Sequence, residues 1–444
     1  MMSMLISYDP INRIALGEVP ITTAEQIPSV VKHAKNAQKA WAALSLNERQ
    51  QKVTLAYEHL VKAQEALTLL ISKEMGKDYR RASYEVGGTI QNSDYFCQEI
   101  AHALAPEPQG HGAQVQYRPL GVVAVISPWN YPLAMANNLL LPALMAGNSV
   151  VLKPSEETPL VADLFVKTLN EILPEGVLQV AHGDAVTGKA LVNADINMVA
   201  FTGSLAAGKH IMASAASSLK RLVMELGGND PMIVMASADI DEAVQFAVAS
   251  SFENAGQMCT STERVYVDTR IADEFEQKVV ALARRYRVGA WDQNNVNIGP
   301  IVNQKQHQAV ISQLKDAEAK GARFLLGAAD YEPPFIQPTV VADITPDMCL
   351  ERDETFGPIV AISRYKHISE AVERANASPY GLGAAVFGGA GAAAVAEQME
   401  AGMVGVNQGA GGAGPWVGAK QSGFGFHGTS AGHRQFAQVR VISK

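Results

Sequence analysis

The spacing of apolar residues divides the chain into a helical N-terminal part and two longer parts in which strands and helices alternate. Apolar positions recur at helical spacing in Ala24–Ala42 and Leu46–Met75, which predicts amphipathic helices. From Gly121 onward, short apolar runs take over, separated by stretches that fit helices of roughly 10–15 residues. The runs that predict strands are 121–126, 149–152, 177–180, 198–201 and 221–225.

A second alternating part follows Gly227. Its first strands are expected at Met232–Val234 and Arg264–Val267, and its first helices at 239–254 and 272–287. Strands that alternate with helices are typical of a parallel sheet covered by helices on both faces. We therefore expect an α/β protein with two such units.

Several shorter segments complete this pattern. Gln116–Pro119 and Ala437–Ser443 alternate like edge strands, whereas Gly388–Ala394 is expected to begin a helix and Gly409–Gly414 to form a flexible loop. The most apolar region, 121–152, is interrupted by prolines, asparagines and a glycine. These interruptions favour a buried βαβ unit over a membrane span.

The composition is that of an ordinary globular protein and narrows the classes of partner. Hydrophobic residues make up 48% and charged residues 18% of the 444 positions, which allows two or three domains. The net charge of −8 argues against a nucleic-acid partner. The first ten residues contain no basic segment and no long apolar stretch, so we expect a cytoplasmic protein without a signal peptide or membrane partner.

The three cysteines, Cys97, Cys259 and Cys349, are too few and too scattered for a disulfide framework or a zinc site, and no metal is expected. Cys259 follows Gly256-Gln-Met, and Glu225 lies 34 residues upstream in Glu-Leu-Gly-Gly. A lone cysteine is more often a small buried hydrophobic residue. Here, however, a thiol and a carboxylate lie close to glycines, which suit backbone that passes near a substrate. The pair supplies a covalent nucleophile and a base that activates water.

Seven short motifs, taken in order, resemble those of the aldehyde dehydrogenase superfamily, and the resemblance runs from about residue 8 to the C-terminus. Each motif is a weak signal, but all seven occur in the family's order at compatible spacings. They are Ser127-Pro-Trp-Asn-Tyr-Pro132, Lys153-Pro-Ser-Glu156, Phe201-Thr-Gly-Ser204, Glu225-Leu-Gly-Gly228, Gly256-Gln-Met-Cys259, Glu354-Thr-Phe-Gly-Pro358 and Lys420-Gln-Ser-Gly423.

The resemblance implies an α/β fold with a Rossmann-like cofactor domain, an α/β catalytic domain and a small β oligomerisation flap. The cofactor domain would comprise residues 1–100 and 122–226, the catalytic domain 227–423, and the flap 101–121 with 424–444. A flap of this kind implies a homodimer or a homotetramer.

The resemblance also assigns roles in the oxidation of a small-molecule aldehyde to its acid. Cys259 would attack the aldehyde carbon, and the side-chain amide of Asn130 with the backbone N–H of Cys259 would hold the resulting oxyanion. After hydride transfer, Glu225 would activate the water that hydrolyses the thioester. A carboxylate removed from water takes up a proton more readily, which suits that role. None of the ten histidines lies in a motif that suggests a base.

The expected cofactor is NAD, with NADP possible, although no Gly-x-Gly-x-x-Gly follows a predicted strand. The strand–turn–helix segment Phe201–Gly208 either holds pyrophosphate at its helix N-terminus or is a plain turn capped by Ser204. By resemblance, Lys153 and Glu156 contact the adenosine ribose, and Glu156 would repel a 2′-phosphate. The predicted cofactor-binding residues are Trp129, Lys153, Ser155, Glu156, Gly183, Gly203, Ser204, Leu226, Glu354 and Phe356.

The substrate is less well specified. The pattern resembles the short bacterial succinate-semialdehyde dehydrogenase branch, whose members commonly bind the substrate carboxylate with two arginines. Asn138 and Glu253 occupy the matching positions and do not pair with a carboxylate as arginine does. One hypothesis is that Glu253 lines the substrate tunnel and favours neutral or amino-bearing aldehydes; the other is that it points away on its helix.

Three rival functions follow from the same residues. A CoA-acylating dehydrogenase of this fold generally lacks the equivalent of Glu225, which is present here. A catalytically silent member of the fold would not need Cys259, Glu225 and Asn130 together. A cysteine hydrolase would leave the cofactor segments unexplained.

Overall fold

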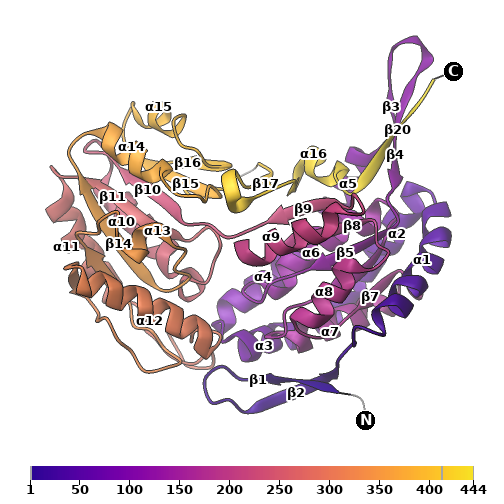
Figure 1. Cartoon of the computed structure of the whole chain (residues 1–444), viewed down its shortest axis with the longest axis horizontal. Coiled ribbons are helices and arrows are strands. Elements are labelled where there is room, and N and C mark those ends of the chain that lie inside the picture. Colours follow the sequence, from indigo (N-terminus) through magenta and orange to yellow (C-terminus); the bar gives the residue numbers. More distant parts are fainter. Residues whose placement is uncertain (1–2, 412–413, 444) are drawn as a thin grey trace.

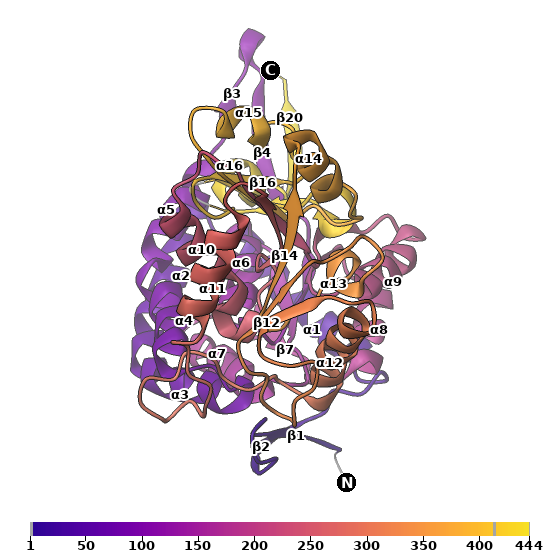
Figure 2. The same cartoon turned by 90° about the vertical axis from the view of Figure 1, so that its left-hand side faces the viewer.

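The computed structural model describes residues 3–411 and 414–443, which form two lobes, each built on a twisted sheet (Figure 1). An antiparallel hairpin of β1 (Met4–Tyr8) and β2 (Ala15–Pro20) precedes the first lobe and lies along its lower edge in Figures 1 and 2. Part of the predicted loop Gly409–Gly414, residues 412–413, lies outside the described residues.

The first lobe contains a six-stranded sheet in the order β18-β9-β8-β5-β6-β7, parallel except for β18. Strands β5, β6 and β8 are buried along their whole length, as the apolar runs predict. The strands are β5 (Val122–Ile126), β6 (Ser149–Lys153), β7 (Leu178–Val180), β8 (Met198–Thr202), β9 (Arg221–Glu225) and β18 (Gly423–Phe424).

Helices cover both faces of this sheet. α6 and α7 pack on one face under an outer layer that includes α2 and α5, and α1, α8 and α9 pack on the other. The helices are α1 (Ile27–Ala43), α2 (Leu46–Leu60), α3 (Gln64–Met75), α4 (Tyr79–Gln91), α5 (Ser93–Leu104), α6 (Pro132–Met145), α7 (Pro159–Asn170), α8 (Ala185–Asn193) and α9 (Leu205–Ala216).

The helix predicted over Leu46–Met75 is divided in two. Its N-terminus is fixed by a capping box in which Ser45 and Glu48 exchange hydrogen bonds. A short 3-10 turn, η1 (Val61–Ala63), separates α2 from α3, and Gly76 in the left-handed conformation ends α3. Apolar spacing continues across the turn, so periodicity alone does not reveal it.

The second lobe contains a seven-stranded sheet in the order β12-β13-β14-β11-β10-β15-β16, parallel except for β12. One face packs on α10, α11 and α12, and the other on α14 and α15. The strands are β10 (Asp230–Val234), β11 (Thr262–Asp268), β12 (Arg323–Leu326), β13 (Thr339–Ala342), β14 (Ile359–Tyr365), β15 (Gly383–Phe387) and β16 (Met403–Val406). The helices are α10 (Ile240–Phe252), α11 (Ala272–Ala283), α12 (Gln304–Ala319), α13 (Cys349–Arg352), α14 (Ile368–Asn376) and α15 (Ala392–Ala396).

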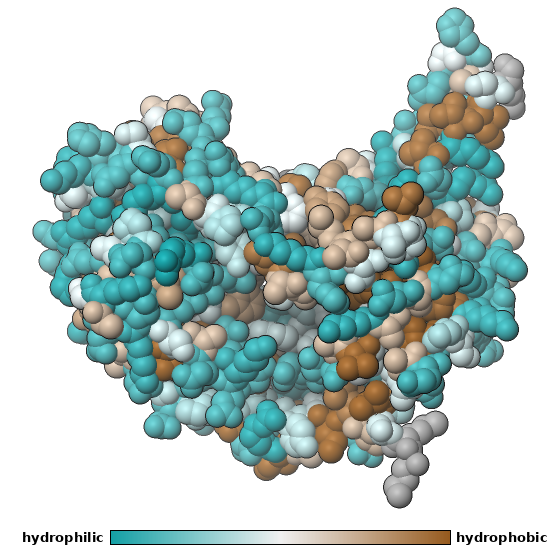
Figure 3. Space-filling model, viewed as in Figure 1, coloured by the Kyte–Doolittle hydropathy of each residue, from teal (hydrophilic) through white to brown (hydrophobic). Residues whose placement is uncertain are grey.

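A three-stranded antiparallel arm projects from the first lobe in both views (Figures 1 and 2). It consists of β3 (Glu107–Pro108), β4 (Gln114–Pro119) and β20 (Ala437–Ile442), so both predicted edge strands pair with each other. Figure 3 shows hydrophobic residues on this arm, where Val439 and Val441 are exposed.

The C-terminal segment returns to the first lobe before it reaches the arm. β18 adds antiparallel to β9, although the sequence placed Gly423 in the catalytic domain and Phe424 in the flap. Next to it lie β17 (Trp416–Val417), β19 (Phe426–His427) and α16 (Thr429–Arg434), and α16 packs on α5. Residues near 420 therefore connect the two lobes.

Candidate active site

The predicted catalytic residues lie between the lobes, at the carboxyl ends of the parallel strands. In the first sheet, β6 and β7 lie on one side of β5 and β8 and β9 on the other, so the strand order reverses at β5. Ligands of open α/β sheets bind at such a switch point. A cavity of about 470 Å³ opens there, on the face that Figure 3 shows hollowed between the lobes. Its lining includes Asn130, Thr202, Cys259, Glu354 and Phe356.

Cys259 follows the 3-10 turn η3 (Glu253–Gly256), which ends the predicted helix 239–254 two residues early and turns the chain into the cavity. Asn254 and Ala255 have φ of 50° and 59°, and Gly256 has φ of 73°. A Cβ on Gly256 would lie 2.0 Å from the carbonyl oxygen of Gly357, so only glycine fits there.

The Cys259 thiol is held in its neutral form. Burial raises its pKa well above the ordinary value, and the carboxylates of Glu225 and Asp230 raise it further. The thiol therefore needs a proton acceptor before it can act as a nucleophile.

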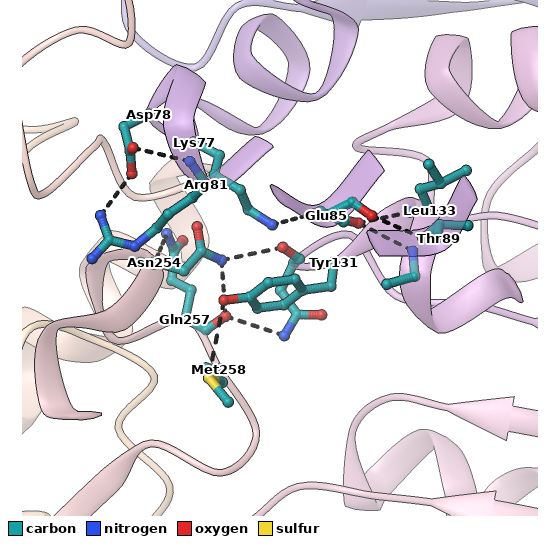
Figure 4. Close-up of polar contacts among 12 residues, drawn as sticks. Lys77, Asp78, Arg81, Glu85, Thr89, Tyr131, Leu133, Asn254, Gln257 and Met258 are labelled. Atoms are coloured by element: carbon teal, nitrogen blue, oxygen red, sulfur yellow. Dashed lines mark hydrogen bonds and ion pairs between the residues drawn. The ribbon is translucent and has the colours of Figure 1, made fainter. Parts of the chain in front are cut away.

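Asn130 lies in the turn that follows β5, and its position is fixed by the segment before Cys259. Its side-chain N–H donates to the carbonyl of Gln257 at 3.1 Å. The side-chain N–H of Asn254 donates to the carbonyls of both Asn130 and Gln257, each at 3.1 Å (Figure 4). The amide expected to hold the oxyanion is thus tied directly to the loop that carries the thiol.

A buried ion pair supports the Asn130 turn from behind. Lys77 and Glu85 are fully buried and 2.5 Å apart, and the Lys77 ammonium lies 3.5 Å from the ring centre of Tyr131. The other oxygen of Glu85 accepts the backbone N–H of Leu133 at 3.0 Å at the start of α6 (Figure 4). One carboxylate thus both neutralises Lys77 and caps the helix that follows the Asn130 turn.

Glu253 lines the cavity beside Cys259, but its carboxylate is occupied. The guanidinium of Arg81, on α4, lies 2.9 Å from both of its oxygens and also pairs with Asp78 at 2.7 Å. The Tyr131 hydroxyl donates to Glu253 at 3.0 Å. Both hypotheses about Glu253 therefore missed its pairing with a cation from the other lobe.

Glu225 ends β9 and is buried at the junction of the lobes. Its carboxylate accepts a hydrogen bond from the Thr202 hydroxyl at 2.9 Å. The imidazole of His427 lies 3.3 Å from the same carboxylate oxygen. A histidine that belongs to none of the recognised motifs therefore lies beside the predicted base.

A second cavity, of about 610 Å³, continues from the first along the first lobe. Its lining includes Trp129, Lys153, Ser155, Glu156, Gly203 and Ser204, six of the predicted cofactor residues. Lys153 is buried and 3.3 Å from Glu156; burial lowers its pKa, and Glu156 partly offsets that effect. Ser204 caps α9, whose N-terminus faces the cavity, so the segment is both a capped turn and a place where an anion fits.

Three further predicted cofactor residues, Leu226, Glu354 and Phe356, line the cavity that contains Cys259. Burial raises the pKa of Glu354 to about 7, opposed by a hydrogen bond from the backbone N–H of Gly228. The buried carboxylate of Glu263 accepts the backbone N–H of Phe356 at 2.8 Å and holds it at a φ of 53°. The Phe356 ring then meets that of Trp129 edge to face, 5.6 Å between centres.

Three predicted site residues, Gly183, Asn138 and the buried Glu225, lie outside these two linings. Gly183 has φ of 148° in the turn before α8, where a Cβ would meet Thr187 at 2.1 Å, but Ala185 and Gly188 of α8 rather than Gly183 itself line the cofactor cavity. Asn138, on α6, lines two other cavities and not the one that contains Cys259. Sequence reasoning missed Arg81, Glu263 and His427, since each acts on a site residue from a distant segment and none belongs to a recognised motif.

The described parts of the chain, residues 3–411 and 414–443, contain no group of three His, Cys, Asp or Glu side chains placed to hold a metal ion. Over the same residues, every helix is too short or too polar to cross a membrane.

Comparisons with known proteins agree with this geometry. The aldehyde dehydrogenase family profile matches residues 3–442. A probable succinate-semialdehyde dehydrogenase [NADP(+)] of Sinorhizobium fredii is 34% identical over 98% of this chain and 91% of its own length. A glutarate-semialdehyde dehydrogenase of Pseudomonas putida is 32% identical over 98% and 93%.

The fold also matches solved structures of aldehyde dehydrogenases. A succinate-semialdehyde dehydrogenase from Burkholderia pseudomallei superposes with a TM-score of 0.95 at 32% identity, covering 99% of this chain and 94% of that one. A lactaldehyde dehydrogenase from Escherichia coli has the same TM-score at 30% identity, covering 99% and 95%. The chain therefore belongs to the aldehyde dehydrogenase family and is an NAD(P)-dependent oxidoreductase of aldehydes.

Proposed function

We propose that Cys259, Asn130 and Glu225 oxidise an uncharged or amino-bearing aldehyde to its carboxylic acid through a thioester on Cys259. The observation that carries the proposal is the direct bond between the Asn130 amide and the Gln257 carbonyl, because it fixes an oxyanion donor relative to the nucleophile loop.

The steps follow from the chemistry of these groups. The thiol loses its proton to a nearby base and its sulfur forms a bond to the aldehyde carbon, leaving a negative charge on oxygen. Asn130 and the Cys259 backbone N–H stabilise that charge. Loss of hydride from the adduct carbon, for which a bound nicotinamide would be the acceptor, leaves a thioester on Cys259. Glu225 then takes a proton from water, whose oxygen forms the new C–O bond as the C–S bond breaks.

The second cavity suits a dinucleotide. The hydroxyl of Ser127 lines it and, among the described residues, has no hydrogen-bond partner, so it is available to a ligand. Lys153 and Glu156 would hold the adenosine ribose, and Glu354 the nicotinamide ribose. Since the Glu156 carboxylate would repel a 2′-phosphate, NAD is the proposed preference.

The lining of the Cys259 cavity supports the proposed substrate class. No Lys, Arg or His is among the described residues that line it, and its walls include Met135, Met258 and Trp416. The guanidinium of Arg81, which contacts the lining residue Glu253, is held by Glu253 and Asp78. A substrate carboxylate would therefore find no unpaired cation in this lining. The two relatives named above are, by contrast, named for semialdehydes that carry a carboxylate.

The exposed arm supports a homodimer or homotetramer. Val439 and Val441 lie on β20, an edge strand whose free side can pair with another copy. The mass of the purified protein in light scattering tests this: a monomer at micromolar concentration would contradict it.

The test of activity is NADH formation with succinate semialdehyde, an ω-amino aldehyde, an aliphatic and an aromatic aldehyde, each with NAD and NADP. We expect turnover with NAD that favours the uncharged and amino-bearing aldehydes and disappears in Cys259→Ala. Preference for succinate semialdehyde would refute the substrate class. A product that forms only with coenzyme A would refute hydrolysis, and failure to bind NAD would refute the whole proposal.

A further inference from the structure

In the proposed reaction, the Glu225 carboxylate takes up one proton from water in every turnover. Overall, aldehyde, water and NAD+ yield carboxylate, NADH and two protons. Glu225 must therefore release the proton it has taken up before it can activate the next water. Glu225 is only 5% exposed, and it is absent from the described lining of the cavity that contains Cys259. A buried base of this kind needs a group that carries its proton away.

His427 is placed to take that proton. Its Nε2 lies 3.3 Å from Oε2 of Glu225, and both side chains are less than 10% exposed. Thr202 donates to Oε2, whereas Oε1 of Glu225 and Nε2 of His427 have no hydrogen-bond partner in the part of the chain that the structure describes. Two buried groups that can share a proton thus lie side by side, and the imidazole nitrogen and one carboxylate oxygen still have hydrogen-bonding capacity to spare.

The His427 ring also lines a third cavity, of about 340 Å³. Polar side chains such as Glu99 and His433 line this cavity as well. Trp416 stacks on His427 at 6.3 Å and lines both this cavity and that of Cys259, so the indole lies between them. His427 itself is absent from the described lining of the Cys259 cavity. Its imidazole therefore connects Glu225 to a space separate from the substrate.

Other titratable side chains line the same cavity as His427. His433 on α16 and Glu99 on α5 line the same cavity, 3.6 Å apart, with Tyr95 beside them. Burial lowers the pKa of His433, Glu99 opposes this, and His427 lowers it further, which places the two imidazoles within electrostatic reach. Neutral imidazole accepts a proton on one nitrogen and releases one from the other.

We propose that His427 removes from Glu225 the proton taken up during thioester hydrolysis and releases it toward the cavity lined by His433 and Glu99. His427 is a positioning and proton-accepting residue that acts through Glu225 and touches neither substrate nor cofactor. The inference rests on the proposed function, because only hydrolysis by a Glu225-activated water generates this proton.

The test separates the hydride step from hydrolysis. When enzyme, NAD and a turned-over aldehyde are mixed in a stopped-flow instrument, NADH forms before hydrolysis, so slow hydrolysis gives a burst of NADH followed by a steady rate. In His427→Ala and His427→Gln we expect the burst to remain near one equivalent per active site. The steady rate should fall about tenfold or more, toward the range typical of a lost acid–base group.

Added imidazole should restore the steady rate of His427→Ala, since the deleted ring leaves room beside an existing cavity, without altering the burst. The acid limb of the steady-rate pH profile should shift in the variant and return with imidazole. His59→Ala removes the imidazole of another His–Glu pair, 2.8 Å from Glu171 and remote from all these cavities, and should change neither phase.

Wild-type steady rates in both His427 variants would overturn the inference. So would full activity in His427→Gln alone, because glutamine holds Glu225 in place but carries no proton. Equal loss of burst and steady rate that imidazole does not relieve would show a purely structural role. Absence of NADH formation in the wild-type enzyme would instead refute the proposed function itself.

Discussion

Replacing Glu253 with glutamine is expected to change which aldehydes the enzyme prefers, because it frees a guanidinium already in place. Lys77 and Arg81 are surrounded by three carboxylates, those of Asp78, Glu85 and Glu253. In Glu253→Gln, two cations face two carboxylates, and Asp78 becomes the one carboxylate that pairs with Arg81 among its partners in the described structure. An anionic aldehyde would then no longer meet an excess negative charge.

The size of the effect follows from Coulomb's law. A substrate carboxylate about 7 Å from the removed charge gains roughly 0.6 kcal/mol at the dielectric constant of water and about 2.4 kcal/mol at an effective value of 20. Because the Glu253 side chain is 31% exposed, the lower half of this range applies. We expect kcat/KM for succinate semialdehyde to rise about 3-fold to 10-fold, with a comparable fall for an ω-amino aldehyde.

The assay is the ratio of kcat/KM for the anionic and cationic aldehydes in the wild type and three variants. Arg81→Gln should move the ratio the opposite way, and the Arg81→Gln/Glu253→Gln double variant should return it toward the wild type, since the local net charge is restored. An unchanged ratio in Glu253→Gln, with kcat for the aliphatic aldehyde intact, would refute the reasoning.

Two further predictions concern Asn130 and Cys259. In Asn130→Ala we expect kcat to fall about 10²-fold to 10³-fold, with NAD affinity by fluorescence titration unchanged; a loss below tenfold would remove Asn130 from the oxyanion site. Because burial and the neighbouring carboxylates raise the pKa of Cys259, its alkylation by iodoacetamide in the cofactor-free enzyme should still accelerate above pH 9, and Glu225→Gln should move that rise to lower pH. Mass spectrometry of the Cys259 peptide measures this; a rate that levels off near pH 8 would contradict the raised pKa.

The sequence predicted the parts of the fold that depend on local patterns. Strands such as β5 and β8 are continuous apolar runs buried on both faces, so they stand out without tertiary information. The turn at Val61–Ala63 did not stand out, since apolar spacing continues through it.

The site shows the same difference between residues that local sequence patterns reveal and residues that only tertiary contacts bring together. Cys259 and Glu225 lie within motifs, and their neighbours in the chain also neighbour them in space. Arg81 lies 172 residues from Glu253, and a charged residue on a helix is ordinarily a solvated one. His427 approaches Glu225 only because β18 and β19 return to the first lobe. Contacts of this kind depend on topology, which apolar patterns determine only coarsely.

The pairing of β18 with β9 has a consequence for synthesis of the protein. Gly423 pairs with Glu225, so β9, which ends in Glu225, meets its outer neighbour only after about 200 further residues have been made. At roughly 5–20 residues per second, β9 stays an open edge on the nascent chain for about 10–40 s. Open edges recruit other strands, so this interval is when a partly made chain is most exposed to aggregation. A ribosome that stalls late in the message leaves behind a first lobe with that edge still unpaired.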